Sequence, residues 1–124
     1  MGYDVHITRK SEWFDREQLG ISFDEWSSYL ATDQSMRLEG VARTTSPAGD
    51  EIEIKGPGIA VWLEYSGHKD NKMAWFNLSR SGNVIVKNPD PEILQKMWQV
   101  AQVLGAKVQG DEGEVYDADG SVES

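Results

Sequence analysis

The sequence predicts an α+β fold, in which an antiparallel meander sheet of about five to six strands carries two packed helices. Three observations predict it. Short segments alternate between apolar and polar residues, which is the period of a β-strand. Two longer segments repeat apolar residues every three or four positions, which is the period of a helix. Short turns rich in glycine and polar residues separate several strands, so consecutive strands are expected to pair.

The chain opens with an expected strand and a charged loop. In residues 3–8 apolar and polar side chains alternate. We therefore expect a half-buried edge strand with His6 on its polar outer face. Residues 9–20 are rich in charge and contain the adjacent rings of Trp13 and Phe14. We expect these rings to pin the loop to the core.

Both expected helices are marked by capping residues. Ser22 precedes an apolar stripe and is followed three residues later by a glutamate, which predicts a capping box and a helix over residues 23–31. Asp90 is the expected N-cap of a second helix over residues 91–104, whose first residue is proline. Gly105 follows the last apolar residue and is expected to end that helix.

Alternation predicts further strands between the two helices. Residues 51–55 alternate strictly, which predicts one face on the core and one charged face in water. Residues 73–78 are apolar on both sides, which is typical of a central strand. The other expected strands of this region are residues 36–39, 59–65 and 84–87.

The domain organisation follows from length and composition. At 124 residues, of which 39% are hydrophobic, the chain is expected to fold as one globular α+β domain over residues 1–116. Its last element is expected to be a small hairpin that pairs residues 107–109 with residues 114–116. Residues 117–124 form the expected acidic C-terminal tail, since they contain no basic residue.

The charge and cysteine content exclude several classes of function. The net charge at pH 7 is −9, and such a surface repels phosphate backbones and favours a basic protein partner. Direct nucleic-acid binding is therefore not expected. The sequence has no cysteine, which excludes disulfides and thiolate chemistry. No apolar run has the length of a signal peptide or a membrane helix, so we expect a cytoplasmic protein without membrane association.

No residue pattern that carries catalysis is found, so the sequence favours a binding protein without an active site, metal or cofactor. One alternative starts from His6, which shares its strand face with Asp4 and Thr8. In this alternative the protein is a small hydrolase or metal-dependent enzyme that uses His6 and nearby carboxylates. The other alternative is a general acidic adaptor whose charge serves only solubility.

The N-terminal segment carries a family resemblance. It reads Tyr-Asp-Val-His-Ile-Thr-Arg-Lys at residues 3–10, Trp-Phe-Asp at residues 13–15 and Ile-Ser-Phe-Asp-Glu-Trp at residues 21–26. This pattern resembles small bacterial immunity proteins of interbacterial polymorphic toxins, including type VI secretion effectors. The resemblance implies an antitoxin that neutralises a cognate toxin domain, basic and nuclease-like, in a one-to-one heterodimer by covering its substrate surface.

An immunity role explains the excess of Asp and Glu over Lys and Arg, because an acidic surface can occupy a basic site that binds phosphate. Such an interface is expected to combine a few buried rings with a rim of carboxylates. The residues expected to contact the partner lie on predicted loops or exposed strand faces: Trp13, Phe14, Asp15, Asp50, Glu51, Glu53, Asp70, Asp111, Glu112 and Glu114.

Overall fold

The computed structural model describes residues 3–70 and 72–123. Within these ranges the chain forms nine strands and two α-helices. The strands are β1 (Asp4–Thr8), β2 (Met36–Leu38), β3 (Val41–Thr45), β4 (Glu51–Lys55), β5 (Ile59–Trp62), β6 (Trp75–Leu78), β7 (Val84–Lys87), β8 (Lys107–Gly110) and β9 (Val115–Tyr116). The helices are α1 (Phe23–Thr32) and α2 (Pro91–Leu104), and a short 3-10 helix, η1 (Ser66–Asp70), follows β5.

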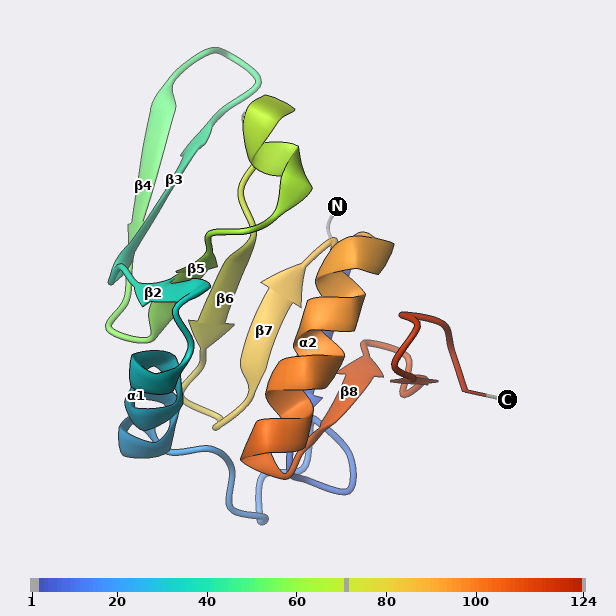
Figure 1. Ribbon diagram of the computed structural model, residues 1–124. Helices are drawn as coiled ribbons and strands as arrows, with labels where there is room; N and C mark the ends of the chain where they lie inside the picture. The colour runs from blue at the N-terminus through green and yellow to red at the C-terminus, as the bar shows by residue number, and fades with distance from the viewer. Residues whose placement is uncertain (1–2, 71, 124) are drawn as a thin grey trace.

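The predicted α+β class is confirmed, with a larger sheet than expected. Seven strands form one antiparallel sheet in the order β2-β5-β6-β7-β1-β8-β9. β3 and β4 form a separate hairpin (Figure 1). The expected meander holds for β5, β6 and β7. β1 then lies between β7 and β8, with Val5 paired to Val86 and Ile7 paired to Val108. The N-terminal strand therefore joins the C-terminal hairpin to the rest of the sheet.

The predicted caps set the helix ends. The Ser22 side chain accepts the Glu25 N–H while the Glu25 side chain accepts the Ser22 N–H, which is the expected capping box. Asp90 caps α2 by accepting the N–H of Ile93, and Gly105 ends α2 with a φ of 64°. α2 has the predicted bounds and α1 is one residue longer than expected. Neither of these helices has the length and apolar character needed to cross a bilayer.

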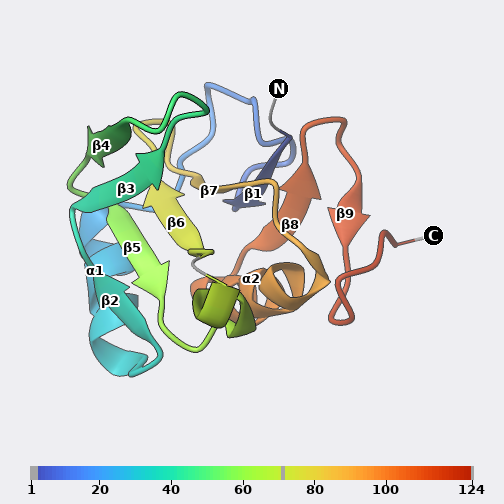
Figure 2. The same ribbon diagram turned by 90° about the horizontal axis from the view of Figure 1, so that it is seen from above.

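The helices and the sheet enclose the main core. α1 and α2 lie on one side of the sheet, whereas the β3–β4 hairpin and the loop after β1 lie on the other side (Figure 2). The largest side chains of the core are fully buried between helices and sheet, among them Trp26, Phe76 and Met97. Burial of each such side chain stabilises the fold by about 1.5–3 kcal/mol.

A partly buried ion pair joins the end of α1 to α2. The Lys96 ammonium donates to Asp33 Oδ2 at 2.7 Å and to Ser35 Oγ at 2.9 Å. Burial by itself raises the pKa of Asp33, but hydrogen bonds from Lys96, Ser35 and Tyr29 outweigh it and hold this pKa well below its usual range. The Asp33 carboxylate therefore stays charged and ties the C-terminal end of α1 to α2.

β1 is a central strand that is covered on both faces, so the expectation of a half-buried edge strand was wrong. His6 is only 3% exposed, and Thr8 is fully buried. The reason lies in the loop of residues 9–20, which folds over the second face of the sheet and stacks Trp13 on the His6 ring. Trp13 pins the loop as predicted, but Phe14 does not, because it remains 60% exposed.

β4 does not contribute a face to the core, which corrects the prediction for residues 51–55. All five of its residues are exposed. β4 pairs only with β3, a strand that the sequence analysis missed. The hairpin leaves the sheet at Gly40, whose N–H donates to the carbonyl of Ile59 and whose carbonyl accepts the N–H of Gly56. Strict alternation at β4 thus reflects a two-faced hairpin and not a strand of the main sheet.

The C-terminal hairpin forms as predicted. Val108 pairs with Tyr116, and Gln109 pairs with Val115. The residues that follow turn back on this hairpin, since the N–H of Glu123 donates to the carbonyl of Val115. Residues 117–123, which include Asp117, Asp119 and Glu123, therefore lie beside β9 at the outer edge of the sheet.

Candidate partner-binding surface

A cleft lies between the β3–β4 hairpin and the sheet face opposite the helices. Its volume is about 500 Å³. The side chains that line it come from the hairpin and from four strands of the main sheet: Asp4, Ala42, Ile54, Ile59, Trp75, Asn77, Ile85 and Lys87. Most of these side chains are apolar, so the cleft offers a partner a largely apolar surface open to solvent.

The strand registers explain why apolar residues gather in this cleft. In the hairpin Ala42 pairs with Ile54, so both side chains project from the same face of the ribbon. In the main sheet Asn77 pairs with both Ile59 and Ile85, which places these three side chains in one row on the second face. The hairpin therefore forms one wall of the cleft and the sheet forms its floor.

The opposite face of the hairpin carries charge. Arg43 lies 3.3 Å from a carboxylate oxygen of Glu53 and 4.0 Å from one of Glu51. Lys55 lies 3.7 Å from the other oxygen of Glu53. Because exposed ion pairs of this kind contribute only about 0–1 kcal/mol, they exchange readily for charges on a partner. Asp50, which immediately precedes β4, is also exposed.

The acidic turn of residues 111–114 is held by internal hydrogen bonds. Asp111 accepts the N–H of Asp4 at 2.9 Å, and its other oxygen lies 2.9 Å from Nε2 of His6. Burial by itself raises the pKa of Asp111, but the His6 and Asp4 hydrogen bonds outweigh it and lower this pKa. Both oxygens of Asp111 are therefore already engaged within the fold.

Glu114 is held through one of its two carboxylate oxygens. It accepts hydrogen bonds from the hydroxyls of Tyr3 and Tyr116. Burial raises the pKa of Glu114, but the Tyr3 and Tyr116 hydrogen bonds help to hold this pKa below its ordinary value. The neighbouring Glu112 side chain is exposed. Of the three predicted contact residues in this turn, Glu112 is the one whose carboxylate remains open to a partner.

The predicted contact residues of the N-terminal loop have different environments. The N–H of Trp13 donates to the Gln109 side chain and its carbonyl accepts from the Asn83 side chain, so its backbone is tied to β8 and to the turn that precedes β7. Phe14 is exposed, and Asp15 accepts the N–H of Glu17 at 2.9 Å.

The predicted contact residues thus form separate regions. The loop with Trp13 adjoins the acidic turn, because the His6 ring lies between Trp13 and Asp111. The β3–β4 hairpin with Asp50, Glu51 and Glu53 lies toward the other end of the sheet (Figure 2). Asp70 lies exposed at the end of η1.

The sequence analysis missed every residue of the cleft. The available signal was the apolar character of both sides of residues 73–78, which indicates that the second sheet face also contacts or exposes apolar surface. Trp75 and Ile85 on that face are only partly covered in the structure. Residues 51–55 gave the complementary signal, because Ile52 and Ile54 form one apolar face, although the prediction assigned that face to the main core.

The described ranges contain no group of three or more His, Asp or Glu side chains that could share a metal ion. His6 has one carboxylate neighbour, Asp111, and its ring is covered by Trp13 at a centroid distance of 4.1 Å. No protein-family model, no curated protein and no solved structure matches this chain.

Proposed function

We propose that this chain is an immunity protein that binds and neutralises a basic, nuclease-like toxin domain in a one-to-one complex. The observation that carries the proposal is the cleft between the β3–β4 hairpin and the sheet. The cleft offers an open apolar surface at Ile54, Trp75 and Ile85. The opposite face of the same hairpin carries the carboxylates of Glu51 and Glu53.

Apolar and acidic features serve different parts of such a complex. Apolar clefts accept the buried anchor side chains that carry most of the free energy of binding in protein interfaces. Ile54 is 53% exposed in the isolated chain, so a partner that covers it removes substantial apolar area from water. The net charge of −9 speeds the encounter with a basic partner and makes it sensitive to salt.

In this proposal the chain inhibits the toxin by covering the surface that binds its substrate. A nuclease presents basic side chains where the phosphates of its substrate bind. The hairpin carboxylates pair with such side chains once the cleft has docked, and substrate is excluded from the same surface. Because such a toxin acts on nucleic acid in the cytoplasm, the proposal assigns this protein to the same compartment.

The alternative of a hydrolase that uses His6 gains no support from the described geometry. A general base needs hydrogen-bond access to its substrate. His6 is 3% exposed, Nε2 is engaged by Asp111, and the ring is stacked on Trp13.

The adaptor alternative makes a different prediction. If the acidic charge serves only solubility, reversal of the hairpin carboxylates leaves partner binding unchanged.

Co-expression with the toxin domain encoded beside this chain tests the proposal. The wild-type chain is expected to protect the cell and to co-purify with the toxin domain in equal amounts. A Glu51→Lys/Glu53→Lys variant is expected to protect less, whereas the matched reversal Asp119→Lys/Glu123→Lys, at two exposed positions of the C-terminal segment, is expected to protect fully. If the wild-type chain neither protects nor co-purifies, the immunity function is rejected.

A further inference from the structure

The outer edge of β4 is open to another strand. Within residues 3–70 and 72–123, β4 pairs only with β3, and all five of its residues are exposed. Both views place β4 on the outer side of the hairpin, with β3 between it and the main sheet (Figure 1, Figure 2). An unpaired strand edge presents a row of backbone donors and acceptors, so another strand can pair with it.

The hydrogen bonds of the hairpin show which backbone groups of β4 point outward. The carbonyl of Asp50 accepts the N–H of Ser46, in the same register as the hairpin that follows. In an antiparallel ladder, pairs joined by hydrogen bonds alternate with pairs that are not. Counted from Asp50, the backbone groups of Ile52 and Ile54 therefore bond to β3. The alternate residues direct their N–H and carbonyl groups away from β3: Glu51, Glu53 and Lys55.

The two outer edges of the main sheet are covered or short. Along β9, Val122 forms a bridge to Tyr116, and the N–H of Glu123 donates to the carbonyl of Val115. β2, at the opposite edge, has only three residues. Proteins limit unwanted pairing at free edges in these ways, and also with a proline or a bulge in the strand. β4 has five residues, no proline and an uninterrupted register with β3, so none of these devices protects its edge.

Charged side chains also discourage pairing at an edge, but those of β4 match a second copy of the same strand. An antiparallel copy centred on Glu53 places Glu51 opposite Lys55. The same register places Ile52 opposite Ile54, in pairs without direct backbone hydrogen bonds, where side chains lie closest. Opposite charges and apolar side chains directly across two strands stabilise their pairing. β4 is therefore complementary to itself.

The backbone matches in the same register. Residues 51, 53 and 55 of one copy lie opposite residues 55, 53 and 51 of the other, so the outward N–H groups of each strand meet outward carbonyls. The two Glu53 carboxylates then face each other, and like charges in this position oppose pairing. Arg43 lies 3.3 Å from a carboxylate oxygen of Glu53, so a cation of the same hairpin reduces this repulsion.

We propose that two copies of the free chain form a symmetric dimer, in which their β4 strands pair antiparallel and join the two hairpins into one four-stranded sheet. A contact between two five-residue strands is smaller than the roughly 1,200–2,000 Å² of a stable interface, so the dimer is weak. It uses the hairpin to which the proposed function assigns toxin binding, so a second copy and the toxin domain compete for this surface. The dimer does not rest on that function, because the free chain forms it without toxin.

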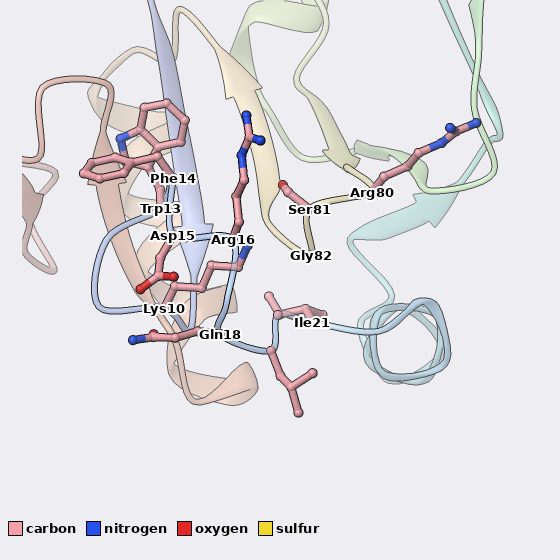
Figure 3. A pocket seen from close by; sticks show the side chains of 12 residues that line it. Lys10, Trp13, Phe14, Asp15, Arg16, Gln18, Ile21, Arg80, Ser81 and Gly82 are labelled. Carbon is pink, nitrogen blue, oxygen red and sulfur yellow. The ribbon is translucent and has the colours of Figure 1, made fainter.

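A different open apolar surface supplies a matched control. A cavity of about 720 Å³ lies between the loop of residues 9–20 and the turn that precedes β7, and Leu19, which is 92% exposed, lines it. Its side chains come from residues 10–21 and 80–82, all outside the strands (Figure 3). This surface therefore offers a second copy no strand edge, and Leu19→Thr is expected to leave self-association unchanged.

Sedimentation equilibrium of the full chain at increasing concentration tests the proposal without toxin. The wild-type mass is expected to rise from that of a monomer to that of a dimer, with a Kd between about 1 μM and 1 mM. Lys55→Glu sets like charges opposite each other twice and is expected to raise this Kd about tenfold or more. Ile52→Thr keeps a strand-forming residue but removes apolar contact, so it is expected to raise the Kd severalfold. Lys69→Glu makes the same charge change at an exposed position on η1 and should dimerise as the wild type does.

A mixture of two variants tests the register of the pairing. Glu51→Lys and Lys55→Glu each set like charges opposite each other in their own dimer, whereas a mixed pair sets opposite charges at both positions again. An equal mixture is therefore expected to dimerise more tightly than either variant alone. The proposal is overturned if the wild-type chain stays monomeric up to about 1 mM. It is also overturned if Lys55→Glu and Ile52→Thr both dimerise as tightly as the wild type, or if the mixture dimerises no more tightly than its parts.

Discussion

The imidazole of His6 lies flat on the indole of Trp13, with ring centroids 4.1 Å apart and an interplanar angle of 5°. This stack joins the central strand of the sheet to a loop that carries much of the recognisable N-terminal sequence. It removes His6 from solvent and turns Trp13 into a structural residue. The histidine that suggested catalysis and the tryptophan that suggested a contact with a partner thus mainly hold the loop on the sheet.

Replacement of Trp13 by alanine is expected to destabilise the fold by about 2–3 kcal/mol, because it removes the ring that covers His6 and leaves a void beneath the loop. Phe14→Ala is the matched control on the adjacent residue. It is expected to change stability by less than about 0.5 kcal/mol, because this ring is mainly exposed. Urea denaturation measures both values. Equal losses for the two variants would contradict the assigned role of Trp13.

The partly buried pair of Lys96 and Asp33 gives a second prediction. Lys96→Met leaves the half-buried Asp33 carboxylate without its cation, which is expected to cost about 2 kcal/mol. A second substitution, Asp33→Leu, in the same chain is expected to recover part of that loss, because it removes the unpaired charge. A double-mutant cycle by chemical denaturation measures the coupling between the two residues. Additive effects of the two substitutions would show that the pair is not coupled.

The same pair predicts a dependence of stability on acid. Asp33 has a lowered pKa in the folded chain, so below its unfolded pKa, which is near 4, the unfolded chain binds more protons than the folded one. The stability due to Asp33 is therefore complete above that pKa and is lost as the pH falls toward the folded value. Asp111 and Glu114, whose pKa values are also lowered, contribute in the same direction.

Denaturation curves at several pH values below 5 measure this loss. Asp33→Asn, which cannot titrate, is expected to show a shallower fall of stability with acid than the wild type. Asp70→Asn, at an exposed position, is the control and should retain the wild-type slope. An unchanged slope in Asp33→Asn would mean that Asp33 is not the carboxylate responsible.

Local signals in the sequence predicted the helices well. Ser22, Asp90 and Gly105 each act through hydrogen bonds or backbone angles within a few residues, so their roles can be inferred from neighbouring residues. The antiparallel run of β5, β6 and β7 was equally accessible, because consecutive strands of a chain usually lie next to each other in a sheet.

The site was less predictable because it depends on contacts between distant residues. The position of β1 between β7 and β8 cannot be inferred from alternation, which is the same for a central and an edge strand. Alternation in β4 likewise does not distinguish a strand on the core from a hairpin beside it. The cleft needs Ile54 of that hairpin to face Trp75 and Ile85, and only the folded chain brings these three together.

The cleft also predicts which exposed aliphatic side chain matters for binding. Ile54→Gln keeps the net charge and is expected to raise the Kd for the toxin domain about tenfold or more, because it removes an apolar anchor. Val103→Gln is the matched control, since Val103 is similarly exposed but lies on α2, in the layer on the opposite side of the sheet. It should bind as the wild type does.

Calorimetric titration of the chain with the toxin domain encoded beside it, at low and at high salt, tests the central claim most directly. The proposal predicts one-to-one binding that weakens as salt is raised and that Ile54→Gln weakens further, with Val103→Gln unchanged. No measurable binding at low salt would contradict the claim, and so would binding that neither salt nor Ile54→Gln affects.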